Sequence, residues 1–465
     1  MRLNILLPLL CLLLTIIPSR AQQAVNAPVP KTDKSGPSLK FDFPAMLVGV
    51  AEYDEGPTGT TVFYFPGGFK GAVDLRGGAP GQINAASLQL GYERKMMQAV
   101  VFSGGSWYGL SAATGVANGL KELKAAEGNT DFIAGVVGAI IFDVGGRRFS
   151  RVTPDDTLGK AALRSVQPGW FPLGARGAGR FAMQGVYFNR GDGADNYVDW
   201  SHSGQGGAFR TVGPTKIGVF TVVNSLGSVV DRDGRVVRCG RNDSDRPCPK
   251  IAEKLKTYGP ISAPFDDKGG PSPNTTITLV VTNQKLPFSE LQRLAVQVHS
   301  SMARAIQPMA TGADGDILYA VTTDDVENPA LTATDLGVIA SEVAWDAVLS
   351  SVPELTARPA ALSNQPNEKD LLKYAGTYVF PGRGELTVSV ASGGLSARFK
   401  GNGRIYFDAG KDYRLTASAG ETFILESKAR EVLKFDDSAG RITGLTMNPG
   451  PWAVRAVSAD SGRKQ

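Results

Sequence analysis

The chain has 465 residues, of which 42% are hydrophobic and 20% charged, a composition typical of a globular protein. A formal net charge of +5 over this length is too small to indicate a nucleic-acid-binding protein. With 2 histidines and 3 cysteines, the chain lacks the ligands for a multi-His or multi-Cys metal site, and we expect neither a metal nor a cofactor. A Ser-His-Asp enzyme would have to use His202 or His299 as its base.

The first 21 residues have the pattern of a signal peptide. Arg2 supplies a positive charge, a mostly apolar run follows over residues 5–17, and Ser19 and Ala21 are small residues where a signal peptidase reads the chain. The apolar run is too short to span a bilayer. We therefore expect cleavage after Ala21 and a periplasmic or secreted protein with no membrane segment.

Export makes the two cysteines of the mature chain informative. Cys239 and Cys248 lie in a polar loop that contains proline, RCGRNDSDRPCPK. In an oxidising compartment this short spacing favours a disulfide between them, and the alternative is a pair of free surface thiols.

Strands and helices alternate through most of the chain. Residues 22–40 are rich in Pro, Ser and Lys without periodicity, which predicts a flexible leader. Ser289 and Gln292 have capping-box spacing, so we expect Ser289 to be the N-cap of a helix. The expected strands lie over residues 60–66, 99–102, 217–223, 276–283 and 317–323, and the expected helices over 110–126, over 289–306 and from a Thr334 cap onward.

The pattern of predicted secondary structure changes over roughly the last hundred residues. Residues 353–370 have the composition of a linker. Residues 371–457 then contain short alternating segments at roughly ten-residue spacing, which predicts an all-β barrel or sandwich module, and 458–465 form a tail.

One stretch offers a nucleophile that needs no histidine. Thr275 follows Pro271-Ser272-Pro273-Asn274 and opens an expected strand. The hydroxyl of an N-terminal threonine can be activated by its own α-amine, whose reference pKa of about 7.7–8.0 suits a base at neutral pH. The chain would have to be cut before Thr275 to create that amine. Two plainer interpretations compete, because Asn274-Thr275-Thr276 is also a glycosylation sequon and strands commonly begin with threonine.

Several long motifs are more specific than this stretch. GPTGTTVFYFP, VDLRGGAPG, VFSGGSWYGLSAATGV and GARGAG are similar to segments of the self-cleaving aminopeptidase family, which includes L-aminopeptidase/D-amidases and β-peptidyl aminopeptidases. FDFP, GQGGAFR, NTTI, QVHSSMARAIQP and DGDILYAVTTDD resemble the endo-type nylon-oligomer hydrolases within that family. Over residues 41–352 the resemblance implies a four-layer αββα catalytic domain of the N-terminal-nucleophile-hydrolase type. The later β segment is similar to small barrel modules appended to some secreted serine hydrolases.

The resemblance also implies a set of site residues. The chain would cleave itself between Asn274 and Thr275, which leaves Thr275 as the nucleophile. Asn224 matches the asparagine that helps to hold the oxyanion, and Asp314 and Asp316 match an acidic pair near the new amine and hydroxyl. Without the resemblance, Asp314-Gly315-Asp316 reads as a turn with two solvated carboxylates.

The chain departs from the family pattern at one position. The nylon-oligomer enzymes carry a lysine in the loop after the GAG glycines, but residues 161–215 of this chain contain no lysine. Val186 or Tyr197 falls near that position, depending on where the insertion GDGAD is placed. Tyr197 is the candidate, because it alone has a polar group to offer.

The sequence therefore predicts an exported amide hydrolase, activated by autocleavage, that acts on small amides or oligopeptides, nylon oligomers among them. The family implies a homo-oligomer of cleaved protomers. Two alternatives stay open: an exo-aminopeptidase on short α-, β- or D-peptides, and a non-catalytic secreted binding protein on the same fold, which the missing lysine favours.

Overall fold

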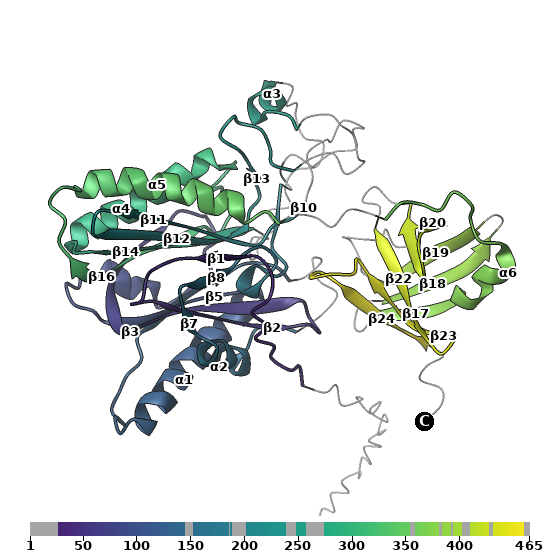
Figure 1. Ribbon diagram of the computed structural model, residues 1–465, viewed down its shortest axis with the longest axis horizontal. Coiled ribbons are helices and arrows are strands. Elements are labelled where there is room, and N and C mark those ends of the chain that lie inside the picture. Colours follow the sequence, from purple (N-terminus) through teal and green to yellow (C-terminus); the bar gives the residue numbers. More distant parts are fainter. Residues whose placement is uncertain are drawn as a thin grey trace, which may run out of the picture.

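The computed structural model describes residues 27–144, 152–185, 187, 201–238, 248–256, 274–353, 359–380, 384–391, 394–401, 410–426 and 431–459. They form an α/β domain followed by a smaller β-barrel, seen on the two sides of Figure 1. No helix among these residues has both the length and the apolar character needed to cross a membrane.

Two sheets of the α/β domain share one long strand, β3 (Thr58–Leu75). Its first part pairs with the second sheet, and residues 70–75 pair with β16 of the first sheet. The first sheet has the order β11 (Gln205–Val212), β12 (Thr215–Asn224), β14 (Thr275–Gln284), β16 (Ile317–Val326) and β3. The second contains β2 (Leu47–Tyr53), β3, β5 (Met97–Ser103), β6 (Val136–Ile140) and β4 (Gln82–Ile83), with β7 (Gln167–Pro168) beside β2.

Helices cover the outer face of each sheet. The first sheet packs against α4 (Phe288–Ser301) and α5 (Ala333–Ser350), and the second against α1 (Ser111–Ala126) and α2 (Asp156–Arg164) (Figure 1). Between the sheets lies an apolar layer to which both contribute, including Phe63, Phe102, Phe220, Leu279 and Tyr319. This arrangement confirms the predicted four-layer αββα architecture.

Short strands complete the domain and hold part of the leader. Lys31 forms a β-bridge with Glu52, and β1 (Ser38–Lys40) pairs with β8 (Trp170–Pro172). The prediction of a flexible leader over 22–40 is therefore wrong for these residues, because backbone pairing fixes them. The remaining elements are β9 (Met183–Gln184) paired with β10 (Ser201–His202), β13 (Ser228–Val229) paired with β15 (Ile306–Gln307), and α3 (Ile251–Lys256).

Two helix starts differ from the predicted caps. Pro287, and not Ser289, is the N-cap of α4, and no side chain of the cap residue satisfies the first turn. Instead, the N–H of Phe288 donates to the Glu93 carboxylate at 2.8 Å, a contact from a distant part of the chain. The cap of α5 is Thr332, two residues before Thr334, and its hydroxyl accepts from the N–H of Asp335.

The C-terminal module is a closed barrel. Strand β17 pairs with both β18 and β24, which closes the circle of eight strands. The inward side chains form a core of their own, with Tyr378, Phe399 and Phe435 among them. The strands are β17 (Gly376–Phe380), β18 (Gly384–Ala391), β19 (Gly394–Gly401), β20 (Asp412–Ala417), β21 (Thr422–Leu425), β22 (Val432–Ser438), β23 (Arg441–Met447) and β24 (Val454–Ser458).

Part of the segment predicted as a linker lies on the barrel. The N–H of Leu362 donates to the Ala417 carbonyl at 2.9 Å, and the Gln365 amide bonds the backbone of Ala417 in both directions. A short helix, α6 (Glu368–Leu371), follows with Asn367 as its cap. The chain between the two units is therefore shorter than composition suggests.

The separate cores predict that the α/β domain folds alone. Its apolar clusters involve only residues before 353, whereas the barrel core involves only residues after 370. We expect a chain that ends at Pro353 to stay soluble and monodisperse, and to unfold within about 5 °C of the corresponding transition in the full chain. Gel filtration and thermal unfolding would measure this. Aggregation of the shortened chain, while the full chain stays soluble, would contradict it.

Candidate active site

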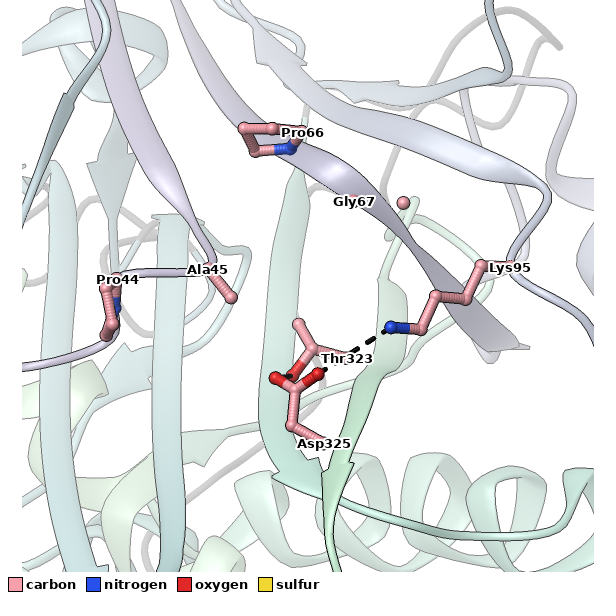
Figure 2. A pocket seen from close by; sticks show the side chains of 8 residues that line it. Pro44, Ala45, Pro66, Gly67, Lys95, Thr323 and Asp325 are labelled. Atoms are coloured by element: carbon pink, nitrogen blue, oxygen red, sulfur yellow. Dashed lines mark hydrogen bonds and ion pairs between the residues drawn. The ribbon is translucent and has the colours of Figure 1, made fainter.

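A cavity of about 170 Å³ has none of the predicted site residues in its lining (Figure 2). Lys95 and Asp325 form an ion pair of 3.7 Å beside it, and Thr323 donates to the same carboxylate. Thr323 and Asp325 lie near the far end of β16, roughly 23–30 Å along the strand from Asp316 at a rise of about 3.3 Å per residue. This cavity is therefore not part of the candidate active site.

Three adjacent strands bring the predicted residues together. Thr275 is the first residue of β14 and pairs with Asn224, the last residue of β12. On its other side β14 runs parallel to β16, and Asn274 forms a bridge with Asp314 just before that pairing begins. Asn224, Thr275, Asp314 and Asp316 are all buried, with at most 2% of their surface exposed.

The peptide bond between Asn274 and Thr275 has two hydrogen-bond donors on its carbonyl oxygen. The Thr275 hydroxyl donates to the Asn274 carbonyl at 2.5 Å. The backbone N–H of Gly315 donates to the same oxygen at 2.9 Å. The hydroxyl predicted to act as nucleophile therefore lies directly beside the carbonyl that it would attack, and that carbonyl is already polarised.

This close approach requires a glycine between the two aspartates. A Cβ on Gly315 would lie 2.7 Å from the Thr275 hydroxyl oxygen and 2.7 Å from the Ala79 carbonyl oxygen. No side chain fits there without moving the backbone of one neighbour.

The VDLRGGAPG motif holds the aspartate segment in place. Arg76 and Gly77 donate their N–H groups to the Asp316 carbonyl, and Ala79 donates to the Asp314 carbonyl at 2.9 Å. A Cβ on Gly77 would lie 2.2 Å from the Asp316 nitrogen, so the loop can pass this closely only with glycine. The motif thus positions residues far from it in the sequence.

Asp314 is held by three donors. Its Oδ2 accepts from the Thr311 N–H at 2.9 Å and from the Thr311 hydroxyl at 2.7 Å, and its Oδ1 accepts from the Leu226 N–H at 3.3 Å. Burial raises the pKa of the Asp314 carboxyl, and these hydrogen bonds oppose the rise without cancelling it.

Asp316 is buried as deeply as Asp314. Its Oδ1 accepts from the Thr276 N–H at 2.6 Å, and its Oδ2 accepts from the Ala310 N–H at 2.9 Å. Burial and then the nearby charge of Asp314 raise the pKa of Asp316 to about 7. The pair therefore binds a proton near neutral pH, and interpreting these residues as solvated turn carboxylates is wrong.

Asn224 has a fixed side-chain orientation. Its Oδ1 accepts from the Met183 N–H at 3.1 Å, and its Nδ2 donates to the Phe142 carbonyl at 3.1 Å. These two bonds hold the Asn224 amide beside Thr275, its partner in the β12–β14 pairing.

The other predicted residues are elsewhere or outside the described residues. Tyr197 and Val186 lie outside them, and so does Cys239, so its pairing with Cys248 stays a prediction. His299 is buried on α4 with its Nδ1 2.9 Å from the Asp74 carboxylate, which agrees with a structural role. Within the described ranges, no three His, Cys, Asp or Glu side chains cluster as a metal site would require.

Sequence reasoning missed the backbone donors of this site. The N–H groups of Gly315, Leu226 and Met183 leave no signal in side-chain patterns. Thr311 could have been found, because it precedes Asp314 by three residues, the spacing at which a threonine and a carboxylate share local hydrogen bonds.

Comparison with known proteins agrees with this geometry. The sequence profile described as Peptidase family S58 matches residues 41–362, and one described as Domain of unknown function (DUF3471) matches residues 361–458. The chain is 41% identical over 342 residues to the 6-aminohexanoate-oligomer endohydrolase of Paenarthrobacter ureafaciens, covering 70% of this chain and 88% of that protein. It is 33% identical over 283 residues to an uncharacterized aminopeptidase of Mycobacterium leprae (strain TN), covering 58% of this chain and 72% of the relative.

Two solved structures align with part of this chain. A Burkholderia sp. beta-aminopeptidase has a TM-score of 0.46 and 16% identity, over 68% of this chain and 88% of its own. The L-aminopeptidase D-Ala-esterase/amidase of Ochrobactrum anthropi has a TM-score of 0.45 and 16% identity, over 69% and 87%. The family assignment depends instead on the profile, which matches well over half of the chain, and on the 41% identical relative. The chain belongs to peptidase family S58, a family of amide-bond hydrolases.

Proposed function

We propose that this chain is an amide hydrolase that cuts itself between Asn274 and Thr275 and then uses Thr275 as an N-terminal nucleophile. One observation carries the proposal: the Thr275 hydroxyl and the Gly315 N–H both lie on the carbonyl oxygen of Asn274. The Gly315 bond belongs to the β-bridge between Asn274 and Asp314, so the feature beyond ordinary strand pairing is the Thr275 hydroxyl on the same oxygen, beside two buried carboxyls.

Self-cleavage would proceed through an ester. The Thr275 oxygen attacks the Asn274 carbonyl carbon, and the Gly315 N–H stabilises the negative charge that develops on the carbonyl oxygen. The C–N bond then breaks, the nitrogen takes up a proton, and the acyl group of Asn274 remains on the threonine oxygen. Water hydrolyses this ester, which leaves a carboxylate on Asn274 and a free amine and hydroxyl on Thr275.

The buried aspartate pair is the candidate proton carrier for these steps. Asp316 hydrogen bonds to the residue next to Thr275, and its raised pKa puts it near neutral pH, where a group both takes and gives a proton readily. The same pair would later favour the protonated form of the new α-amine, because nearby carboxylates stabilise a cation.

Turnover would repeat the chemistry on a substrate amide. The free α-amine of Thr275 takes the hydroxyl proton as the threonine oxygen attacks the substrate carbonyl, and it returns the proton to the leaving nitrogen. Water then hydrolyses the acyl-threonine ester, which releases the carboxylate product and restores the hydroxyl. Asn224 lies opposite Thr275 and is the proposed residue that helps to hold the oxyanion. Tyr197 remains the proposed replacement for the missing lysine.

For the substrate we propose linear oligomers joined by amide bonds, cut internally. The support is the name 6-aminohexanoate-oligomer endohydrolase, carried by relatives about 40% identical over 70% of this chain. Removal of single residues from a free amino end is the second candidate, which the name of the mycobacterial aminopeptidase favours. We also propose export through residues 1–21, a Cys239–Cys248 disulfide, and assembly of cleaved protomers.

Self-cleavage predicts two fragments in the purified protein. Mass spectrometry should find a chain that begins at Thr275, and Thr275→Ala should leave one uncut chain, because no hydroxyl remains to attack. Thr276→Ala is the matched control and should still be cut. A single uncut chain in the wild type would contradict the proposal and would support a non-catalytic binding protein.

Internal cleavage predicts activity without a free amino end. The enzyme should hydrolyse an N-acetylated linear 6-aminohexanoate oligomer at a rate comparable to that of the unblocked oligomer, since neither substrate terminus needs recognition. Chromatography of the products would measure both rates, with Thr275→Ala as the inactive control. Release of single units from the unblocked oligomer alone would identify an exo-acting enzyme instead.

The raised pKa of Asp316 predicts a pH-dependent stability of the uncut chain. In the folded state this carboxyl keeps its proton up to about pH 7, whereas in the unfolded chain it loses it near pH 4, so the free energy of unfolding should fall as pH rises between these values. Replacing Asp316 by Asn in the Thr275→Ala chain should remove on the order of 2 kcal/mol of the difference between pH 5 and pH 8.

Urea denaturation at the two pH values would measure that difference. Asp131→Asn, at an exposed position, is the matched control and should leave it unchanged. An equal pH dependence with and without the Asp316 carboxyl would show that its proton is not taken up on folding.

A further inference from the structure

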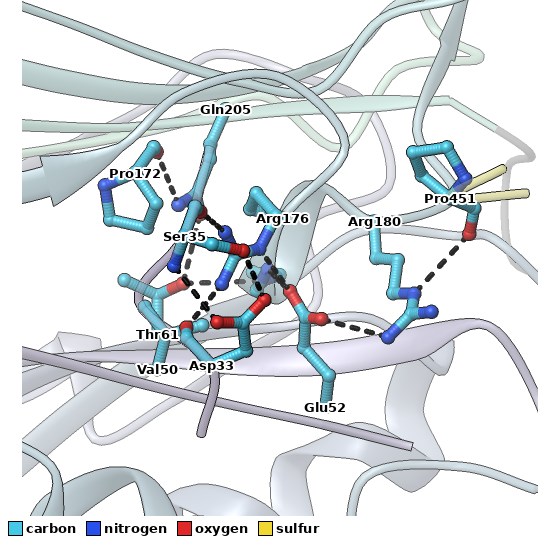
Figure 3. Close-up of polar contacts among 12 residues, drawn as sticks. Asp33, Ser35, Val50, Glu52, Thr61, Pro172, Arg176, Arg180, Gln205 and Pro451 are labelled. Carbon is cyan, nitrogen blue, oxygen red and sulfur yellow. Dashed lines mark hydrogen bonds and ion pairs between the residues drawn. The ribbon is translucent and has the colours of Figure 1, made fainter. Parts of the chain in front are cut away.

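The barrel contacts the α/β domain through the loop between β23 and β24, residues 448–453. The indole ring of Trp452 stacks on the imidazole of His202, with ring centroids 4.1 Å apart and planes 7° from parallel. Arg180 donates its Nε–H to the Pro451 carbonyl at 3.4 Å, and Figure 3 shows its side chain reaching toward that loop.

The surface that receives this loop is held firmly. Arg180 forms ion pairs with Glu52 at 2.7 Å and with Asp54 at 2.6 Å, and its side chain is only 12% exposed. Phe181 packs its ring edge-on against His202, with centroids 5.0 Å apart. Because other residues of the α/β domain hold Arg180 and His202 in place, these two side chains present a preformed surface to the loop.

The loop is shaped in advance as well. Asn448 has a left-handed backbone conformation, and its N–H donates to the Val432 carbonyl at 2.7 Å. Its side-chain oxygen accepts from the Val432 N–H at 3.0 Å, and Ala453 closes the turn by donating to the Gly450 carbonyl. Because the loop and the surface that receives it are both ordered before they meet, little conformational entropy is lost when Trp452 is held in one place.

A short path leads from Trp452 to the nucleophile. His202 pairs with Met183 across β10 and β9, Met183 donates to Asn224, and Asn224 lies opposite Thr275. With strand spacings of about 5 Å and the 4.1 Å ring stack, the path from the indole to Thr275 is roughly 19 Å long. A 6-aminohexanoate unit has seven chain atoms and spans roughly 8 Å when extended, so between two and three units cover that length.

The Trp452 nitrogen adds an independent observation. Its Nε1–H is buried and has no acceptor among the residues that the structure describes. A buried donor without an acceptor is costly, and the carbonyl of an amide substrate would supply one.

We infer that Trp452 is a specificity-determining residue: the loop 448–453 forms a wall that contacts the distal part of a linear oligoamide while its proximal amide reaches Thr275. The inference rests on the proposed function. A dimer is too short to touch the indole, whereas a longer oligomer stacks its methylene segments on it and offers it a carbonyl.

The test compares two soluble oligomers of 6-aminohexanoate, a dimer and a pentamer, on the full-length protein. Trp452→Ala should raise KM for the pentamer about three- to tenfold, the effect of losing one aromatic contact, and leave kcat and the dimer kinetics unchanged. Trp452→Phe should restore part of the pentamer KM. Leu372→Ala is the matched control, because Leu372 is exposed and follows α6, which Figure 1 places at the end of the barrel away from the α/β domain.

Each variant is also checked for self-cleavage on a denaturing gel, and His202→Ala removes the same stack from the other side if Trp452→Ala does not fold. Equal changes for dimer and pentamer, or a loss of thermal stability with no change in either KM, would overturn the inference while leaving the proposed function in place. A wild type that hydrolyses neither oligomer would contradict the proposed function, and this inference with it.

Discussion

The register of three buried strands is the constraint on which the site depends. Thr275 meets Asn224 across β12 and β14, and the parallel pairing of β14 with β16 places it beside the Asp314–Asp316 segment. Because side chains alternate between the faces of a sheet, a slip of one residue would turn Thr275 away from all of these partners. The apolar layers on both faces of this sheet prevent such a slip, since it would carry every core side chain of β14 to the opposite face.

In that register two carboxylates are buried, which is possible only because backbone N–H groups lie within hydrogen-bond distance of them. Burying ionised groups is unfavourable unless hydrogen bonds replace the lost water. Here the replacements are N–H groups of Thr276, Ala310, Thr311 and Leu226, which reach the carboxylates through tight loops. The hydrogen bonds do not offset the burial completely, so the packing that fixes the geometry also raises the pKa values of both carboxyls, as the proposed proton carrier requires.

The sequence predicts the strands, the helices and the barrel well, because hydrophobic periodicity reports on burial directly. It fails where a distant contact replaces a local signal: Glu93 satisfies the first turn of α4 in place of Ser289, and β8 holds the leader. The site divides in the same way. Thr275, Asn224 and the aspartates follow from the family resemblance, but local sequence makes Asp314 and Asp316 a solvated turn, since nothing near them reveals the VDLRGGAPG loop that buries them.

The α/β domain and the barrel contribute to different properties: the first to the packing around Thr275, the second to the binding of substrates. Their apolar cores share no residue, so the barrel contributes little to the packing that positions Thr275. Among the described residues, its contact with the α/β domain includes a stacked ring pair and a long hydrogen bond, at the edge from which Met183 reaches the Asn224 side chain. A contact of that size is too small to rearrange a buried sheet, but it can affect which substrates bind beside that sheet. The effect of the barrel should therefore appear in the binding of long substrates and not in the chemistry at the threonine.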